Sequence, residues 1–318
     1  RSAMAESGQR GSNMQKIIRT YRKYRQLYLF LLLPVVYVAV FNYAPMVGLQ
    51  IGFKKFTITN TIWNSPWVGM YQFQKFLSSY QFRRVFVNTL LLSAYAVAAA
   101  FPFPIIFALT LNSISKDRFR KITQTITYIP HFISIVVLVS IVNQILHPLN
   151  GIYGMLGRLL SGKVPDDLLA NPSVFPHVYV WSGVWQNFGY NSIIYFAALS
   201  GVSPELHEAA QVDGASRFRR VIHIDFPTIL PTVTIMLILR MGSVMSLGFQ
   251  KIYLMQNTLN LSASEVISTY VYKMGLGSGA SNDYSYSTAV DMFNSIVNLI
   301  MITSANYISR TVGETSLW

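Results

Sequence analysis

The sequence predicts an all-helical membrane protein with six transmembrane helices. Hydrophobic residues make up 52% of its 318 residues and charged residues only 12%, whereas a soluble domain carries about 25% charged residues. The apolar residues also gather in long segments that are separated by basic connections. Such segments suit a hydrocarbon layer of about 30 Å, which takes roughly 20 helical residues to cross.

Six segments have this length, and each is apolar on all faces, as expected of a helix in lipid. They are Leu27–Ala44, Val85–Leu111, Ile126–Leu146, Val178–Leu199, Ile229–Gln250 and Ser287–Ile308. Several contain proline, for example Pro34 and Pro130, which neighbouring spans make tolerable. We therefore expect one membrane domain over residues 27–310.

The two ends of the chain are expected to be short tails, residues 1–26 and 311–318. Residues 1–13 are small, polar and rich in Gly and Ser, which is typical of a cloning remnant or a disordered tail. The first apolar segment is too long for a cleaved signal peptide, and no small-x-small cleavage site follows it. Alternate connections hold 15 Lys and Arg on the side of the termini and 9 on the other. The positive-inside rule then places both termini in the cytoplasm.

Several classes of function are disfavoured by what the sequence lacks. There is no Cys, which excludes disulfides and thiolate chemistry. The five His residues have no ligand spacing, so no metal site is expected. No Gly-x-x-x-x-Gly-Lys-Ser/Thr loop is present, so we expect no catalytic residue and no enzyme activity. The net charge of +13 comes from residues between apolar runs, which does not favour nucleic acid as a partner.

The connection between the fourth and fifth spans, residues 201–227, predicts a helix-turn-helix. Ser203 is a good N-cap, and Pro204 suits the first helical position. Gly214 can adopt the left-handed conformation that ends a helix. Ser216 can cap a second helix, which we expect Pro227 to stop.

Two interpretations of this connection stay open on these residues alone. The small pair Ala209 and Ala210 can let the backbone of another protein approach closely, and Glu208 beside them offers a charge for an Arg or Lys of that partner. Alternatively, the segment is a solvated surface loop.

The spacing of this segment resembles the signature of permease subunits of ATP-binding cassette (ABC) importers. That signature is Glu-Ala-Ala, three residues, Gly, nine residues and Ile-x-Leu-Pro, and this chain differs from it only by Phe226 in place of Leu. The resemblance implies the type I ABC importer permease fold, in which this loop docks on the ATP-hydrolysing subunit. The residues that take this role by resemblance are Glu208, Ala209, Ala210, Asp213, Gly214, Ile224 and Pro227.

Other segments resemble the carbohydrate-uptake branch of these permeases, and in particular importers of polysaccharide-derived oligosaccharides such as alginate fragments. The matching segments are Trp67–Phe73, Asn88–Leu90, Gly248–Tyr253, Val266–Tyr272 and Ser316–Trp318. The chain departs from that branch in having Gln250 where Glu is usual, and Asp291 where Gly is usual.

The resemblance implies a multi-pass protein of the bacterial cytoplasmic (inner) membrane with several partners. These are a second homologous permease, two ATP-binding subunits, an extracytoplasmic solute-binding protein, an oligosaccharide and membrane lipid. ATP and Mg²⁺ are expected in the partner subunits, and no cofactor is expected in this chain.

Amides, hydroxyls and flat aromatic faces are the groups that bind sugars, and they cluster along the fourth and fifth spans. The predicted substrate path comprises Trp185, Asn187, Tyr190, Asn191, Arg240, Gln250, Tyr253 and Asn257. Hydrogen bonding between helices and an interfacial aromatic belt are the alternative roles. The outer connections hold nine basic and four acidic residues, which favours an acidic oligosaccharide such as an alginate or pectin fragment.

Arg240 is a charged residue near the middle of the fifth predicted span, where it must face a partner or water. It could pair with Asp291 in the sixth span, or it could line the cavity and bind a substrate carboxylate. An ion-coupled secondary sugar transporter is the alternative function. It would normally place several ionisable groups in its spans, and only these two qualify.

Overall fold

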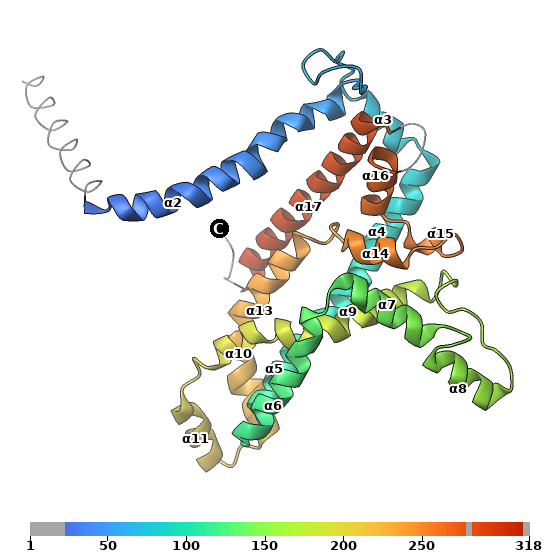
Figure 1. Ribbon diagram of the computed structural model, residues 1–318. Helices are drawn as coiled ribbons and strands as arrows, with labels where there is room; N and C mark the ends of the chain where they lie inside the picture. The colour runs from blue at the N-terminus through green and yellow to red at the C-terminus, as the bar shows by residue number, and fades with distance from the viewer. Residues whose placement is uncertain (1–22, 278–281, 314–318) are drawn as a thin grey trace, which may run out of the picture.

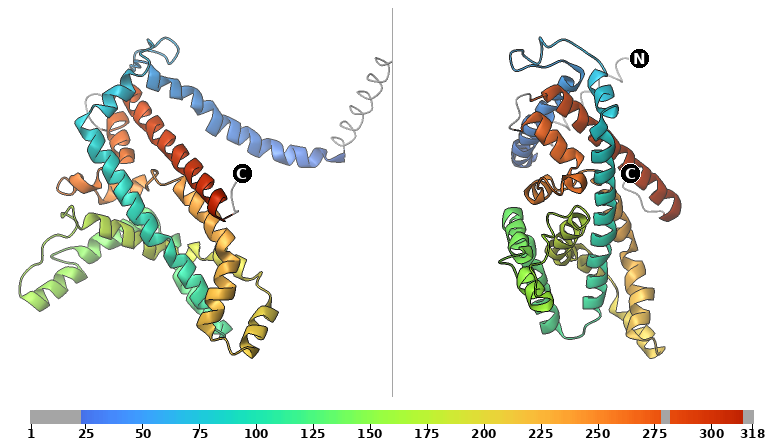
Figure 2. Two further views of the ribbon diagram at one scale, coloured as in Figure 1. Left: turned by 180° about the vertical axis from the view of Figure 1, so that it is seen from behind. Right: turned by 90° about the vertical axis from the view of Figure 1, so that its right-hand side faces the viewer.

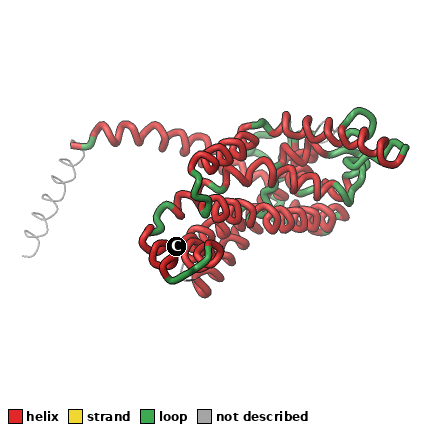
Figure 3. The backbone as a smooth tube through the Cα atoms, turned by 90° about the horizontal axis from the view of Figure 1, so that it is seen from below, coloured by secondary structure: helices red, strands yellow, loops and turns green. Residues whose placement is uncertain are grey.

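The structure is a computed structural model that describes residues 23–277 and 282–313, and its regular structure there is helical (Figure 3). One isolated bridge pairs Lys54 with Trp67 in this part of the chain. The predicted all-helical fold is confirmed. Most of the two predicted tails, including residues 1–13, lies outside the described residues.

The first predicted span belongs to a longer helix that stands apart from the rest of the molecule (Figure 1). α2 (Arg25–Val38) continues through a π-helical segment, Ala39–Tyr43, and a 3₁₀ segment, Ala44–Phe53. None of the α2 residues is buried. This helix therefore relies on contacts outside its own chain.

The second predicted span lies within a long rod that runs from one end of the molecule to the other (Figure 2, right). After the short helix α3 (Tyr71–Leu77), the rod consists of α4 (Tyr80–Ala100) and α5 (Pro102–Asn112). The Ser79 hydroxyl caps α4 by accepting a hydrogen bond from the Phe82 N–H at 3.2 Å.

The third predicted span, Ile126–Leu146, is not one straight helix. α6 (Asp117–Tyr128) and α7 (Ile135–Leu146) meet at 98° across a 3₁₀ turn. Pro130 fits the first turn of that 3₁₀ segment, and the Ser134 hydroxyl accepts from the Val137 N–H at 3.3 Å to begin α7. The proline and the new cap together explain the bend.

The fourth predicted span is interrupted. α8 (Ile152–Ser161) leads to α9 (Phe175–Asn191), and α10 (Ile193–Leu199) follows after a break at Ser192. The Ser192 hydroxyl donates to the Gly189 carbonyl. At Gly189 an added Cβ would lie 2.3 Å from the Thr127 carbonyl oxygen, so the close approach of α6 and α9 requires glycine there.

The helix in the fifth predicted span begins earlier and ends earlier than predicted. α11 (Pro204–Val212) and α12 (Arg217–Arg220) are followed by a π-helical segment, Val221–Asp225, and α13 (Phe226–Met241). Pro227 does not stop this helix, because the π-helical turn shifts the hydrogen-bond register just before the proline.

At the other end of the fifth span, the helix stops at Met241 and not at Gln250. The Met245 N–H beyond the end of α13 donates to the Asn298 side chain at 2.9 Å. This N–H therefore has a hydrogen-bond acceptor although the helix does not continue. Four further helices follow: α14 (Phe249–Met255), α15 (Leu261–Ser264), α16 (Ile267–Gly275) and α17 (Tyr284–Gly313), which contains the sixth predicted span.

In the described part of the chain, four helices have the length and apolar composition needed to cross a membrane. They are Arg25–Phe53, Tyr80–Asn112, Arg217–Met241 and Tyr284–Thr311, and the bent pair α6–α7 is a fifth candidate. The break at Ser192 leaves α9 and α10 too short by this measure. The predicted count of six is therefore not reproduced by helix length alone.

Three buried apolar clusters follow one another along the molecule. The outer cluster surrounds Phe76 where α3 meets α16 and α17, the middle one surrounds Phe175 and Ile252, and the last surrounds Ile229. α3 and α16 thus mark one end of the molecule, which we call the outer end. α11 marks the opposite end (Figure 1).

Candidate coupling segment and substrate path

The predicted helix-turn-helix is confirmed by the structure. Ser203 has extended backbone dihedral angles (φ −64°, ψ 128°), and Pro204 begins α11. Two hydrogen bonds close the end of this helix, from the Ala215 N–H to the Ala210 carbonyl at 2.8 Å and from the Gly214 N–H to the Gln211 carbonyl at 3.1 Å. This pattern requires a left-handed residue, and Gly214 supplies it with φ 78°.

A second cap begins α12 directly after this turn. The Ser216 hydroxyl accepts from the Arg219 N–H at 3.3 Å. Residues 203–225, which we call the coupling segment, therefore have a defined backbone even though neither α11 nor α12 contains a buried residue.

The surface of the coupling segment is open and partly apolar. Leu206, Val212 and Phe218 are exposed by 54%, 88% and 73%, and Glu208 and Ala209 are also exposed. Ala210 and Ile224 are half-buried, whereas Asp213 and Pro227 are exposed. Apolar side chains beside a carboxylate on a protruding helix are suited to a protein partner.

One polar contact ties α11 to the base of α13. The imidazole Nε2 of His207 lies 3.1 Å from the carboxylate Oδ1 of Asp225, which is 2% exposed. Sequence reasoning did not single out this pair. A signal was available, because Asp225 lies between the apolar residues Ile224 and Phe226.

Two α9 members of the predicted substrate path, Asn187 and Tyr190, contact a histidine that was not predicted. The side-chain oxygen Oδ1 of Asn187 lies 2.9 Å from His131 Nδ1. The Tyr190 ring stacks on His131, with centroids 3.8 Å apart and planes at 4°. Trp185 is 47% exposed on the same helix. His131 lies in the 3₁₀ turn between α6 and α7, so its position depends on the bend.

Asn191 and Arg240 meet in a separate small cavity of about 130 Å³, which Tyr195 and Met236 also line. Arg240 forms no ion pair with Asp291 in the described part of the chain, and both side chains are exposed. The guanidinium of Arg240 therefore remains available to a ligand.

The remaining predicted path residues lie at or just beyond α14. Tyr253 stacks on Phe249 at 5.4 Å and meets the edge of Tyr272 at 5.1 Å, and Gln250 is exposed. The Asn257 side chain donates to the Leu169 carbonyl at 2.9 Å and accepts from two N–H groups of its own loop. Contacts thus join Asn187 to Tyr190 through His131 and bring Asn191 beside Arg240, but they do not join the eight residues into one surface.

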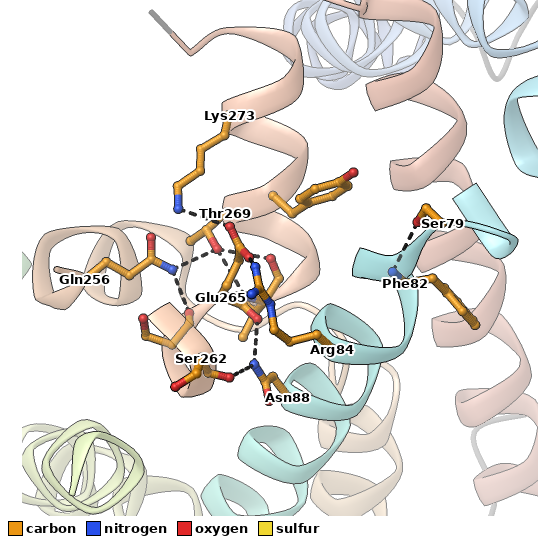
Figure 4. Close-up of polar contacts among 12 residues, drawn as sticks. Ser79, Phe82, Arg84, Asn88, Gln256, Ser262, Glu265, Thr269 and Lys273 are labelled. Carbon is orange, nitrogen blue, oxygen red and sulfur yellow. Dashed lines mark hydrogen bonds and ion pairs between the residues drawn. The ribbon is translucent and has the colours of Figure 1, made fainter. Parts of the chain in front are cut away.

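Most charges of the outer connections are paired or buried. Lys75 pairs with Asp283 at 2.9 Å. Glu265 is contacted by both Arg84 and Lys273, within a polar network that also holds Asn88 (Figure 4). The basic excess read from the sequence is therefore smaller at the surface.

Lys251, which was predicted to lie in an outer connection, is 7% exposed. Its ammonium donates to the Tyr179 carbonyl at 2.8 Å and lies 4.9 Å from the centroid of that ring. Burial lowers the pKa of the Lys251 ammonium to about 8. Lys251 thus connects α14 to α9 and adds little to the electrostatic field at the protein surface.

Comparison with known proteins gives consistent matches. Residues 100–314 match the family described as binding-protein-dependent transport system inner membrane component. Protein LplB of Bacillus subtilis is 40% identical over 292 residues, which cover 92% of this chain and 91% of LplB. The polygalacturonan/rhamnogalacturonan transport system permease protein YteP of the same organism is 37% identical, with 92% and 90% covered.

Two solved structures are also similar. One is a bacterial ABC transporter involved in the import of the acidic polysaccharide alginate, and the other is a bacterial alginate ABC transporter in complex with an alginate pentasaccharide-bound periplasmic protein. Both match with a TM-score of 0.84 and 34% identity, over 94% of this chain and 99% of theirs.

Proposed function

Because the chain belongs to the family of binding-protein-dependent transport system inner membrane components and is the permease of a sugar ABC importer, we propose that it moves an acidic oligosaccharide into the cytoplasm. The observation that carries this substrate class is the guanidinium of Arg240, which forms no ion pair within the described residues and lines a cavity with Asn191. A guanidinium fork matches a carboxylate bidentately. The similar alginate importer and YteP, which is named for polygalacturonan, support a uronate chain.

The coupling segment is the proposed docking site for an ATP-hydrolysing partner subunit. α11 buries none of its side chains, yet its backbone is fixed by the left-handed turn at Gly214 and by the His207–Asp225 contact. A rigid, exposed and partly apolar helix can transmit movement from a partner to α13. On this proposal the coupling segment and both termini lie in the cytoplasm, and ATP and Mg²⁺ bind to the partner.

Two other partners fit the remaining surfaces. α2 has no buried residue, and we assign its apolar surface to a second, homologous permease as well as to lipid. The outer end, which holds α3 and α16, is assigned to the extracytoplasmic solute-binding protein. A relative with a bound periplasmic protein supports this last partner.

The coupling proposal is tested by reversing one charge. The importer is reconstituted with its ATPase and binding protein, and ATP hydrolysis is measured with and without uronate oligosaccharide. Glu208→Lys should abolish the stimulated hydrolysis and leave the thermal unfolding of the permease unchanged. Glu205→Lys is the matched control, since Glu205 is an exposed carboxylate one turn earlier on α11. Equal loss in both variants, or loss in neither, contradicts the assignment of Glu208.

The energy source separates the importer from an ion-coupled secondary transporter. Uptake into proteoliposomes should require ATP and persist when an uncoupler removes ion gradients. Uptake that the uncoupler stops and that needs no ATP would establish the alternative.

A further inference from the structure

We propose that a polar cavity beside the coupling segment binds a phosphate-bearing anion. The cavity has a volume of about 490 Å³ and lies between the α5–α6 connection, α6, α11 and α12. Three guanidinium side chains line it, those of Arg120, Arg217 and Arg220. The proposal depends on the proposed function only for the side of the membrane on which the cavity lies.

Most of the hydrogen-bond donors of two of these side chains are unused. Arg217 Nη2 lies 3.5 Å from the Ser115 hydroxyl, and Arg220 Nη1 lies 3.5 Å from the side-chain oxygen Oε1 of Gln211. Both distances are at the outer limit for a hydrogen bond. Within the described residues, Arg220 Nε is buried and has no hydrogen-bond partner. A buried N–H without a hydrogen-bond partner costs free energy. An oxyanion in the cavity would supply the missing acceptor.

The charge balance of the cavity also favours an anion. The carboxylate of Asp117 pairs with Arg120 at 2.7 Å, and that of Asp225 contacts His207 at 3.1 Å. Asp225 also interacts electrostatically with Arg220, but neither Arg217 nor Arg220 lies within ion-pair distance of a carboxylate among the described residues. Three guanidinium groups and two carboxylates line the cavity, so an excess of positive charge remains to attract an anion.

Phosphate is the chemical class that fits these donors best. A guanidinium binds phosphate oxygens bidentately, and a phosphate monoester or diester presents several oxygens that two such groups can share. The bound anion would connect α12 to the α5–α6 connection, and so it would restrain the coupling segment. The same chemistry could come from a soluble phosphate compound or from the headgroup of an anionic lipid.

Binding is tested on the full chain, copurified with its partner permease in maltoside micelles, by calorimetric titration with inorganic phosphate. Sodium chloride at equal ionic strength provides the reference. We expect saturable phosphate binding, and a dissociation constant raised about tenfold or more in Arg220→Gln, because a charge-assisted interaction is lost. Arg217→Gln gives a second test at an exposed position.

Arg219→Gln is the matched control, since Arg219 lies on the same helix and does not line this cavity. Its dissociation constant should stay within about twofold of the unsubstituted protein. If Arg219→Gln raised the dissociation constant as much as Arg220→Gln does, phosphate binding would depend only on the net charge of α12, and the proposal would fail. Absence of saturable binding by the unsubstituted protein in lipid-free micelles would also overturn it.

Mixed micelles with phosphatidylglycerol distinguish the two sources of phosphate. If the lipid headgroup occupies the cavity, adding this lipid should compete with inorganic phosphate, and Arg220→Gln should remove the competition. If the ligand is soluble, phosphate affinity should not depend on the lipid. Both outcomes support the site and identify its ligand.

Two further measurements separate this proposal from the others. Glu208→Lys should leave phosphate binding unchanged, because Glu208 does not line the cavity. Failure of the phosphate titration would therefore leave the coupling proposal intact. If phosphate binds the permease pair but not the complete importer, an acidic side chain of the ATPase fills the cavity, and the phosphate site is excluded.

Discussion

The two ends of the molecule are built in opposite ways. At the outer end, the Phe76 ring is 1% exposed and packs against Phe82, Tyr270, Tyr286 and Phe293. At the end that carries α11, no residue of α11 or α12 is buried, and the Phe218 ring is 73% exposed. The outer end is stabilised by contacts within the chain, whereas the coupling segment offers its surface to other molecules. Substitutions at the two ends should therefore affect different properties.

The largest effect is expected at the aromatic cluster of the outer end. Phe76→Ala leaves a cavity among four rings and should lower the free energy of unfolding by about 3–5 kcal/mol. Phe218→Ala, the same substitution at the coupling segment, should change it by no more than about 0.5 kcal/mol while it abolishes stimulated ATP hydrolysis. Thermal unfolding in detergent and ATPase assays measure the two effects. Similar destabilisation by both would remove the distinction between the ends.

A smaller effect is expected from the charge network of the outer end (Figure 4). Glu265→Gln removes the charge that Arg84 and Lys273 share at a side chain that is only 9% exposed. We expect a loss of about 1.5–3 kcal/mol, the range for hydrogen bonds to charged groups. Glu208→Gln should leave the unfolding free energy unchanged and lower the ATPase activity. A stable Glu265→Gln variant would show that the network contributes little.

Two glycines allow a comparison in which replacement by Ala introduces the same backbone strain. Gly162 ends α8 with φ 69°, and Gly214 ends α11 with φ 78°; neither has an atom within 4 Å of an added Cβ. Each Gly→Ala variant should lose about 1–2 kcal/mol through left-handed strain alone. Only Gly214→Ala should also reduce the coupling of ATP hydrolysis to substrate. Reduced coupling in Gly162→Ala would trace the defect to lost stability.

An effect on stability as small as that of Phe218→Ala is expected between the two ends, at Arg240. Since Arg240 forms no ion pair with Asp291 in the described residues, Arg240→Gln should change the unfolding free energy by no more than about 0.5 kcal/mol. Uptake of uronate oligosaccharides should fall about tenfold, because a charge-assisted contact is lost, while uptake of any neutral oligosaccharide that is transported should not. Arg240→Lys should restore it only in part, since Lys lacks the bidentate fork. If Arg240→Gln changed the uptake of uronate and neutral oligosaccharides by the same factor, binding of a substrate carboxylate by Arg240 would be excluded.

Local signals predicted the coupling segment almost residue by residue. Pro204, Gly214 and Ser216 each carry a conformational preference that acts within a few residues, and all three act as expected, whereas Ser203 takes the N-cap position without a capping hydrogen bond. Apolar length was a weaker guide. It located the helices in the second and sixth spans, but it could not show the bend after Pro130 or the end of the fifth helix at Met241. Those features depend on a proline in a 3₁₀ turn and on an Asn298 side chain from α17.

The substrate path was the hardest part to predict, because it depends on tertiary contacts. Residue type alone could not show that the Asn257 side-chain amide donates to the Leu169 carbonyl. It also could not show that Lys251 is buried against Tyr179, or that His131 joins Asn187 and Tyr190. Each of these contacts joins elements that are far apart in the sequence.

The separate position of α2 has a consequence for how the subunit is produced. None of the 14 residues of this helix is buried in the described part of the chain. If a second permease covers α2, as proposed above, a copy made in excess of that partner would keep this long apolar helix uncovered, where membrane proteases can recognise it. We therefore expect unpaired copies to be degraded faster than paired ones, so that turnover keeps the two permeases in equal amounts in the cell.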